Sequence, residues 1–275
     1  MGTEPQSILV VKLGGTDGVD FSAICKDVAE LVSQGKPMVL VHGGSAEANA
    51  LGEALGYPPQ FITSPSGYTS RYTDMKTLEI FSMAVNGKVN TLLVSQLQSM
   101  GVNAFGISGL DGQLMKAKRK DSIRSIKNGK RLIIRDDQSG KITEVDANLL
   151  NLLLNAGYVP VVAPLAMGEN GEALNTDADR AAAMVAAALQ AEILLLLTAV
   201  PGLMRDFPDE TTLISRLHTS QLDEAMQCAE GRMKKKILGA QEALEGGVNQ
   251  VIIADGRSAN PIRMALAGQG TWIQS

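Results

Sequence analysis

A lysine and two glycines follow an apolar run near the start of the chain. Residues 8–11 are apolar and mostly β-branched, which predicts a buried parallel strand, and Lys12, Gly14 and Gly15 come after it. A buried ammonium group is costly unless it meets an opposite charge, and open α/β sheets bind ligands at the carboxyl ends of their strands. Glycines let backbone N–H groups approach an anion. We predict that Lys12 contacts a phosphoryl group; the alternative is a strand-end lysine that reaches water.

A second strand with two glycines comes next. Residues 37–41 predict another buried strand, and His42, Gly43 and Gly44 separate it from a helix expected over 46–55. Because the first turn of a helix presents unpaired N–H groups, a phosphate can bind there. Two such turns on neighbouring parallel strands predict an anion site.

Later polar residues could complete such a site. Arg71 lies in a loop or hairpin over 57–74. Asn175, Asp177 and Asp179 stand at the start of an alanine-rich helix. Ordinary helix capping accounts for one of these three polar side chains but not readily for all of them, so we interpret the cluster as a binding site.

Strands and helices alternate along the chain. This pattern predicts an α/β fold with a doubly wound, largely parallel, open twisted sheet between two helical layers. There is no Walker A sequence, so ATP would be bound by another route. The other predicted strands are 102–107, 158–163, 193–198, 251–254 and 271–273, and the other helices are 21–34, 75–100 with a break at 86–87, 146–156, 219–228 and 231–245.

The composition narrows the classes of protein. The chain has 275 residues, of which 45% are hydrophobic, and its net charge of −4 does not indicate nucleic-acid binding. Two cysteines and two histidines do not make a zinc cluster, and the cysteines are expected to be reduced. No signal peptide or membrane span is evident, so a cytoplasmic protein is expected.

Residues 115–135 are strongly basic. They hold nine lysines and arginines and one acidic residue, Asp121. Residues 132–135 and 141–145 predict a hairpin. This hairpin is either a solvated surface or a docking patch for an acidic partner.

As an ordered set, these motifs resemble the amino acid kinase family and, most closely, its acetylglutamate kinase branch. The resemblance runs from Ile8 to about Ile273, and the basic hairpin and Ser70–Asp74 are similar to the subgroup of LysW-aminoadipate kinases. The motifs that carry it are Lys12-Leu13-Gly14-Gly15, His42-Gly43-Gly44, Arg71, Asn175–Asp179 and Gly231-x-Met233-x-x-Lys236.

This resemblance implies an activity and a partner. ATP, with Mg²⁺ bridging its phosphates, would phosphorylate the side-chain carboxylate of 2-aminoadipate, which is joined through its amino group to a small acidic LysW-type carrier protein in lysine biosynthesis. It also implies one domain over 1–275 with a substrate and carrier lobe, 7–168, and an ATP-binding lobe, 169–275. The implied carrier-docking residues are Lys118, Arg119, Lys120, Lys130 and Arg131.

The family also implies roles for the site residues, without a metal site made by the protein. Lys12 and Lys236 would flank the transferring phosphoryl group, and Asp179 would hold both lysines. Arg71 would bind the substrate's α-carboxylate. Backbone N–H groups of Gly14, Gly15, Gly43 and Gly44 would bind the phosphoryl group and its neighbours, Asn175 would bind the substrate, and the nucleotide would lie near Thr198 and Gly202.

Departures from the family pattern leave alternatives open. Asp177 stands where acetylglutamate kinases usually have asparagine, Ser45 replaces a common third glycine, Ala199 a common aspartate, and spacing favours Lys236 over its two neighbouring lysines. The alternatives are an acetylglutamate kinase of arginine biosynthesis, a bifunctional kinase that also takes carrier-linked glutamate, and a non-catalytic relative. The short stretch before Ile8 leaves no room for an extra N-terminal helix, so a homodimer is expected by family analogy.

Overall fold

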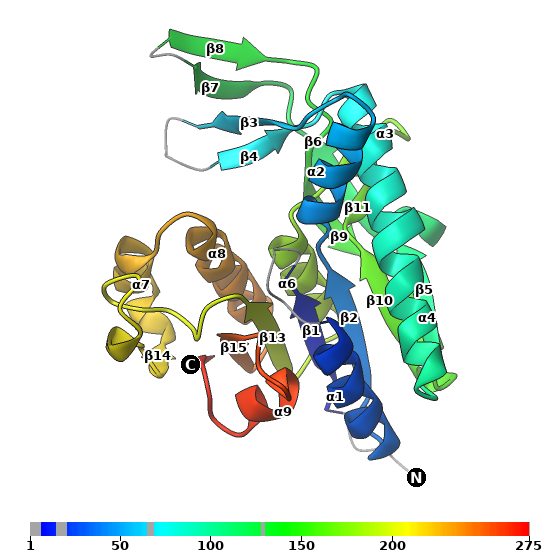
Figure 1. Ribbon diagram of the computed structural model, residues 1–275, viewed down its shortest axis with the longest axis vertical. Helices are drawn as coiled ribbons and strands as arrows, with labels where there is room; N and C mark the ends of the chain where they lie inside the picture. The colour runs from blue at the N-terminus through cyan, green and yellow to red at the C-terminus, as the bar shows by residue number, and fades with distance from the viewer. Residues whose placement is uncertain (1–6, 15–20, 65–68, 128–129, 275) are drawn as a thin grey trace.

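The computed structural model describes residues 7–14, 21–64, 69–127 and 130–274, and is built around an eight-stranded sheet (Figure 1). Its central strand, β1 (Leu9–Leu13), lies between β2 (Met38–His42) and β13 (Ile193–Thr198), and both neighbours run parallel to it. Because the carboxyl ends of these three strands meet at one edge, the residues after them share one region of the molecule. The other strands are β10 (Val159–Ala163), β5 (Ala104–Ser108), β15 (Gln250–Asp255), β16 (Thr271–Gln274) and β14 (Arg216–His218), in the order β14-β16-β15-β13-β1-β2-β10-β5.

Helices cover both faces of this sheet, as predicted. Along β1, Leu9 and Val11 belong to one hydrophobic cluster and Val10 belongs to the other, because successive side chains of a strand point to opposite faces. The Val10 face packs against α5 (Ala147–Asn155), α6 (Ala178–Ala188), α7 (Leu222–Cys228) and α8 (Arg232–Glu245), and the other face packs against α1 (Phe21–Ser33), α4 (Thr91–Ser99) and α9 (Pro261–Leu266). The fold is therefore a three-layer α/β/α sandwich, and within the described strands of the sheet only β15 and β16, next to the edge strand β14, pair antiparallel.

Two short strand pairs project from one end of the sandwich. The pairs β3–β4 and β7–β8 lie side by side there, above the layer that holds α7 and α8 (Figure 1). A four-stranded sheet, in the order β12-β11-β6-β9, connects them to the core. The bounds of these elements are β3 (Gln60–Thr63), β4 (Thr69–Tyr72), β6 (Met115–Arg119), β7 (Ile123–Lys127), β8 (Lys130–Ile134), β9 (Gly140–Val145), β11 (Leu165–Gly168) and β12 (Ala173–Asn175).

The predicted basic hairpin is wrong. Residues 130–134 pair with 123–127, whereas 140–145 pair with 115–119. The basic stretch therefore contributes strands to two different sheets. The sequence located two of these four strands, at 132–135 and 141–145, but it contains no information about which strands become partners.

The predicted break at residues 86–87 corresponds to a change of helix type. The chain stays helical from α3 (Met75–Ser82) through the π-helix η1 (Met83–Asn90) into α4. Such π-helical turns often occur near functional sites. The remaining short elements are α2 (Ser45–Ala54) and the 3₁₀ turns η2 (Asp111–Gln113), η3 (Glu210–Thr212) and η4 (Thr219–Gln221).

The predicted lobe boundary between residues 168 and 169 falls in the turn between the antiparallel strands β11 and β12. The division into a substrate lobe and an ATP lobe stays a prediction. Among the described helices, none combines the length and the apolar character that a membrane span requires.

Candidate active site

Three charged side chains meet below the carboxyl end of β1. The Asp179 carboxylate lies 2.9 Å from Nζ of Lys12, and its two oxygens lie 2.9 and 3.1 Å from Nζ of Lys236. These side chains come from β1, α6 and α8, and all three are buried. Lys12 shares the sheet face of Val10, which is the face covered by α6 and α8. The neighbouring lysines do not occupy this place, because Lys235 pairs with Asp177 instead.

The cluster carries more positive than negative charge. Burial alone would raise the pKa of Asp179, but the two ammonium groups beside it hold that pKa well below its ordinary value. Burial lowers the pKa of Lys236 to about 8; the charge of Asp179 opposes this change and that of Lys12 adds to it. Two cations thus share one anion, and the uncompensated positive charge is available to an anionic ligand.

A cavity of about 360 Å³ opens beside this cluster. Two helices present N-termini without a side-chain cap to it: α2, which follows Gly44, and α8, which follows Gly231. Uncapped first-turn N–H groups and buried lysines form the kind of environment that binds phosphates. The predicted site residues that line this cavity are Lys12, Gly14, Gly43, Gly44, Arg71, Asp179, Thr198 and Lys236.

Three of the predicted glycines need separate comment. The N–H of Gly43 donates to the carbonyl oxygen of Leu13 at 3.1 Å, while Gly43 lines both cavities of the site, and its contact with a ligand stays a prediction. Gly202 does not line the cavity, and a Cβ at that position would lie 2.6 Å from Oγ1 of Thr271, so its small size serves packing against β16. Gly15 lies outside the described residues.

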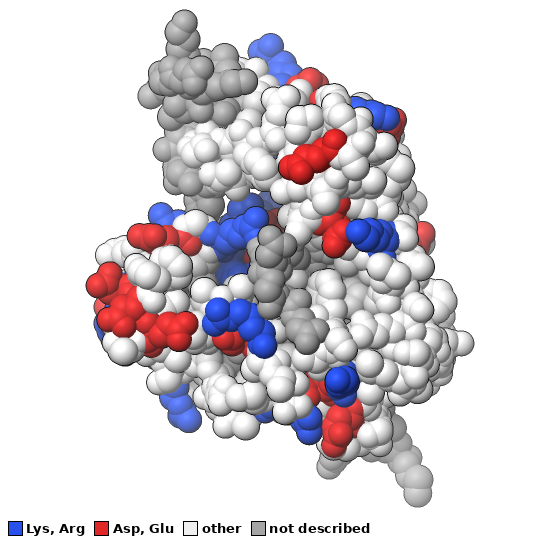
Figure 2. Space-filling view, viewed as in Figure 1, with Lys and Arg blue, Asp and Glu red and all other residues white. Residues whose placement is uncertain are grey.

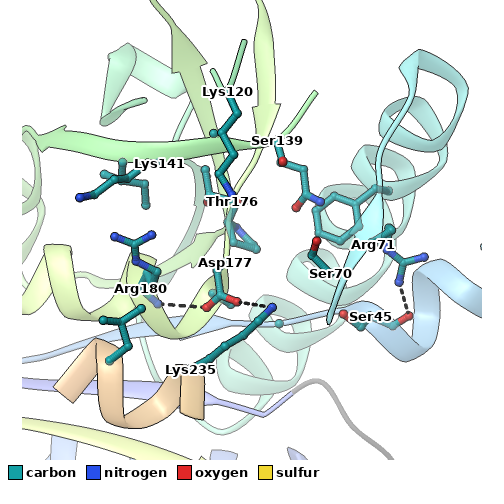
Figure 3. Close-up of a pocket in the computed structure, with 18 of the residues that line it drawn as sticks. Ser45, Ser70, Arg71, Lys120, Ser139, Lys141, Thr176, Asp177, Arg180 and Lys235 are labelled. Carbon is teal, nitrogen blue, oxygen red and sulfur yellow. Dashed lines mark hydrogen bonds and ion pairs between the residues drawn. The ribbon is translucent and has the colours of Figure 1, made fainter. Parts of the chain in front are cut away.

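A second cavity, of about 420 Å³, shares Gly43, Gly44 and Arg71 with the first (Figure 3). The Arg71 guanidinium lies between the rings of Phe61 and Phe81, at 5.4 and 5.9 Å from their centroids. Its Nη2 donates to Oδ1 of Asn49 at 2.6 Å. Burial lowers the pKa of Arg71, and the charge of Arg232 adds to this effect. Arg71 is therefore held rigidly at the junction of the two cavities.

Two residues of the Asn175–Asp179 cluster have structural contacts. Nδ2 of Asn175, in β12, donates to Oγ1 of Thr73 at 3.0 Å, and Asn175 lines the second cavity. Asp177 caps α6 by accepting from the N–H groups of Asp179 and Arg180, and its carboxylate lies 3.2 Å from Nζ of Lys235 (Figure 3). Asp177 thus orients the first turn of α6, which carries Asp179.

The basic strands β6 and β9 border the second cavity. Lys120 and Lys141 line it, and Lys118 lies directly opposite Lys141 across the two strands. These three lysines are exposed and form no ion pair with any part of the chain that the structure describes. Figure 2 shows lysine and arginine side chains gathered in the hollow beneath the projecting strand pairs.

The other predicted docking residues are placed differently. Arg119 is partly buried, and its Nε and Nη2 donate to the backbone carbonyls of Asp137 and Arg135 at 2.8 and 3.0 Å. It therefore ties β6 to the segment before β9. Lys130 and Arg131 lie in β8, away from the pairing of β6 with β9, and their side chains lie outside what the structure describes.

Sequence reasoning missed Lys141, Arg180 and Asn49. Lys141 and Arg180 line the second cavity, and Asn49 holds Arg71. Lys141 lies beyond the basic stretch at residues 115–135, and only its pairing with β6 brings it beside that stretch. Asn49 stands one helical turn after Ser45, so helical spacing could have suggested that both residues face the same way.

The described side chains include no group of three or more His, Cys, Asp or Glu that could hold a metal ion. The Asp179 carboxylate is engaged by two lysines. The oxygens of Asp179 are therefore already committed to ammonium groups in this structure.

Buried lysines and uncapped helix N-termini at the carboxyl ends of parallel strands define an α/β protein built to hold a phosphate-bearing ligand. Comparison with known proteins is more specific: residues 7–255 match the amino acid kinase family. The chain belongs to the amino acid kinase family.

Similar proteins include two curated relatives and a solved structure. The chain is 54% identical over 267 residues to the [LysW]-aminoadipate kinase of Deinococcus radiodurans, covering 97% of this chain and 91% of that protein. It is 48% identical over 269 residues to the [LysW]-aminoadipate kinase of Thermus thermophilus, covering 97% and 100%. N-acetylglutamate synthase from Neisseria gonorrhoeae, complexed with coenzyme A and N-acetylglutamate, matches with a TM-score of 0.79 and 27% identity over 98% of this chain and 60% of that one.

Proposed function

We propose that this chain transfers the γ-phosphoryl group of MgATP to the side-chain carboxylate of 2-aminoadipate, bound through its amino group to a LysW-type carrier protein in lysine biosynthesis. The two relatives described above carry this activity in their names. The single structural observation that carries the proposal is the cluster of Lys12, Asp179 and Lys236 beside two uncapped helix N-termini.

The reaction needs charge neutralisation rather than a general base. A carboxylate with a reference pKa of about 4.3 is already ionised at neutral pH. Its oxygen attacks the γ-phosphorus, the bond from that phosphorus to the β,γ-bridging oxygen breaks, and ADP leaves while an acyl phosphate forms. Both reactants are anions, so catalysis consists of positioning and of stabilising the charge on the transferring group. Lys12 and Lys236 supply that charge, and Asp179 keeps both ammonium groups in place.

The two cavities suit the two substrates. MgATP places its phosphates in the cavity beside Lys12, between the first turns of α2 and α8, with Gly14 and Thr198 at its wall. Aminoadipate occupies the second cavity, where Arg71 binds its α-carboxylate and Asn175 contacts its carbon chain. Gly202 acts on the nucleotide only indirectly, through the packing of its turn.

The partner is a small acidic carrier, and the pairing of β6 with β9 supports this. Lys116 lies opposite Glu144 and forms an ion pair of 3.1 Å with it, whereas Lys118 lies opposite Lys141. Like charges directly opposite each other destabilise a strand pair, unless an anion lies over both. A carrier with an acidic surface supplies this anion while its attached aminoadipate enters the cavity that Lys120 and Lys141 line.

The alternative within the family is an acetylglutamate kinase. Asp177 was the sequence feature that argued against it, but its contacts in the structure are a helix cap and the ion pair with Lys235. An asparagine could also accept the capping hydrogen bonds. The unpaired lysines of β6 and β9 therefore remain the discriminating feature. Carrier-linked glutamate differs from carrier-linked aminoadipate by one methylene group, and the same cavity is open to both.

We further propose a homodimer that forms through one of the two edges of the main sheet. Strand β5 is that edge, and its Phe105 is 42% exposed. Along the helix that begins at α3, Met83 and Leu92 are 48% and 58% exposed. An exposed edge strand with apolar side chains is a surface that proteins usually cover, and a second copy of the chain would cover it.

An assay that compares three substrates tests the proposed activity. The purified chain is given MgATP and hydroxylamine, which traps acyl phosphates, together with either carrier-linked aminoadipate, carrier-linked glutamate or free N-acetylglutamate. We expect trapping with carrier-linked aminoadipate. Trapping with free N-acetylglutamate alone would make the chain an acetylglutamate kinase and would leave Lys118 and Lys141 as solvated surface residues.

A further inference from the structure

The imidazole ring of His42 lies between Gly43, which follows β2, and Asn90 of the π-helix η1. It stands at the end of β2 and is completely buried. Its Nδ1 lies 2.7 Å from the carbonyl oxygen of Gly43, and its Nε2 lies 3.0 Å from Nδ2 of Asn90. Nδ2 of Asn90 also donates to the carbonyl oxygen of Val161 at 2.7 Å. The two ring nitrogens are therefore both engaged.

These partners define the tautomer of His42. The Asn90 atom that donates to a carbonyl oxygen is an NH₂ group, so its second hydrogen points to Nε2, which must be unprotonated. Nδ1 then carries the ring proton and donates it to Gly43. Burial lowers the pKa of His42 to about 4; the hydrogen bond to Gly43 opposes this change and the charge of Lys12 adds to it. The ring is neutral at pH 7.

The hydrogen bond from His42 fixes a peptide group that borders the cleft. The carbonyl of Gly43 and the N–H of Gly44 belong to one planar peptide, and in a trans peptide they point in opposite directions. Among the described residues, the one cis peptide bond precedes Pro208. Holding the Gly43 carbonyl against the buried ring therefore turns the Gly44 N–H away from it. Gly44 lines both cavities of the active site.

Two close approaches fix η1 against this unit. A Cβ on Gly44 would lie 2.7 Å from Cγ1 of Val85, and a Cβ on Gly106 would lie 2.2 Å from Oδ1 of Asn90. Gly106 belongs to β5 and is absent from the lining of both cavities. A line of direct contacts thus runs from the edge strand through Asn90 and His42 to the Gly44 peptide.

We propose that His42 and Asn90 are positioning residues, which hold the Gly44 N–H in the direction of the transferring phosphoryl group. The activity readout of this inference rests on the proposed kinase function. A fixed donor contributes most where charge develops during the reaction. Misorienting it therefore lowers kcat more than it raises KM for MgATP.

Two substitutions at His42 separate the two halves of the network. In His42→Asn the side-chain amide nitrogen takes the place of Nδ1 and can still donate to Gly43, but the link to Asn90 is lost. In His42→Gln the longer side chain reaches Asn90 and leaves the Gly43 carbonyl without its donor. We expect H42N, which loses only the link to Asn90, to lower kcat a few-fold and H42Q to lower it about 10- to 100-fold, both with little change in KM for MgATP.

A second pair of variants acts from outside the cleft and keeps the test decisive if the His42 variants fold poorly. Gly106→Ala places a methyl group against Oδ1 of Asn90, and we expect it to lower kcat by about as much as H42N. Gly87→Ala, in the same π-helix as Asn90, is the matched control, because no heavy atom lies within 4 Å of its Cβ. We expect G87A to retain the activity of the unmodified chain.

Long-range ¹H–¹⁵N NMR of the free protein tests the tautomer without any substrate. His218, the other histidine, is exposed and gives the second set of ring signals. A proton on Nε2 of His42, equal loss of kcat in H42N and H42Q, or unchanged kcat in H42Q and G106A would each overturn the proposal. If the unmodified chain phosphorylates no carboxylate, the proposed function fails, and the tautomer together with the Gly44 amide signal in H42Q still tests the orientation.

Discussion

Two basic regions border the same cleft, and their charges are held differently. At the phosphoryl site, Lys12 and Lys236 are buried, and their ammonium groups lie within 3.1 Å of Asp179. On β6 and β9, Lys118 and Lys141 are exposed and have no carboxylate partner among the described residues. Buried charges act with little screening, whereas exposed charges act mainly on association and weaken with salt. The first region is therefore suited to chemistry and the second to capturing a partner.

The largest expected effect is at the buried site, where two substitutions distinguish the loss of a positive charge from the loss of stability. Lys12→Met removes one phosphoryl-directed cation and leaves Asp179 paired with Lys236, so we expect kcat to fall about 100-fold or more with little change in stability. Asp179→Asn leaves two lysines without their shared anion, so we expect a similar loss of kcat and a loss of about 3 kcal/mol in unfolding free energy.

Steady-state kinetics and urea denaturation measure the two quantities for each variant. Equal stability of the two variants would contradict the role of Asp179 as the group that holds both lysines.

The next effect is a pH dependence of the reaction at the buried site. In the proposed mechanism the ammonium form of Lys236 is the active one, and its pKa is about 8, so we expect kcat/KM for MgATP to fall as pH rises above that value, by about tenfold per unit. Bound phosphates favour the ammonium form, so kcat should fall only at higher pH. Lys236→Arg is the control, because arginine does not deprotonate in this range. A high-pH limb that persists in K236R would assign the titration to another group.

A smaller effect distinguishes Arg119 from its exposed neighbours. Its two hydrogen bonds to backbone carbonyls tie β6 to the segment before β9. Arg119→Lys keeps the charge but loses the fork of donors, so we expect about 1 to 2 kcal/mol of lost unfolding free energy. Lys120→Arg is the matched control and should leave stability unchanged. If R119K unfolds like the unmodified chain and instead weakens carrier binding, Arg119 belongs to the docking surface after all.

The sequence predicted the fold well because its strands are buried on both faces. Short apolar runs such as 8–11 and 193–197 are typical of central parallel strands, and the helices between them follow from 3.6-residue spacing. Pairing in the projecting region was not predictable. Residues 132–135, 141–145 and 115–119 are short, and their patterns do not match one another in a way that selects a partner, so several pairings are compatible with the sequence.

For the site, motif spacing located Lys12, Asp179 and Lys236. These residues lie in β1, α6 and α8, and the packing of these three elements brings their side chains together. It did not distinguish a side chain that faces the cleft from one that serves packing. Gly202 and Gly43 belong to recognisable turns, yet one packs against Thr271 and the other donates its N–H to Leu13. The partnership of His42 with Asn90 depends on a π-helix, which has no sequence signature of its own here.

The most direct test of the two-region account is a single-turnover measurement with carrier-linked aminoadipate. Two variants are compared with the unmodified chain: Lys12→Met, and the double reversal Lys118→Glu with Lys120→Glu, which leaves Arg119 in place. Lys26→Glu with Lys76→Glu, on exposed helix surfaces, is the charge-matched control. We expect K12M to bind the carrier normally and transfer slowly, and the double reversal to transfer normally at saturation but bind weakly, with its deficit shrinking as salt rises. If the double reversal binds as the charge-matched control does, or if K12M loses binding instead of transfer, the division between a chemical region and a capturing region is wrong.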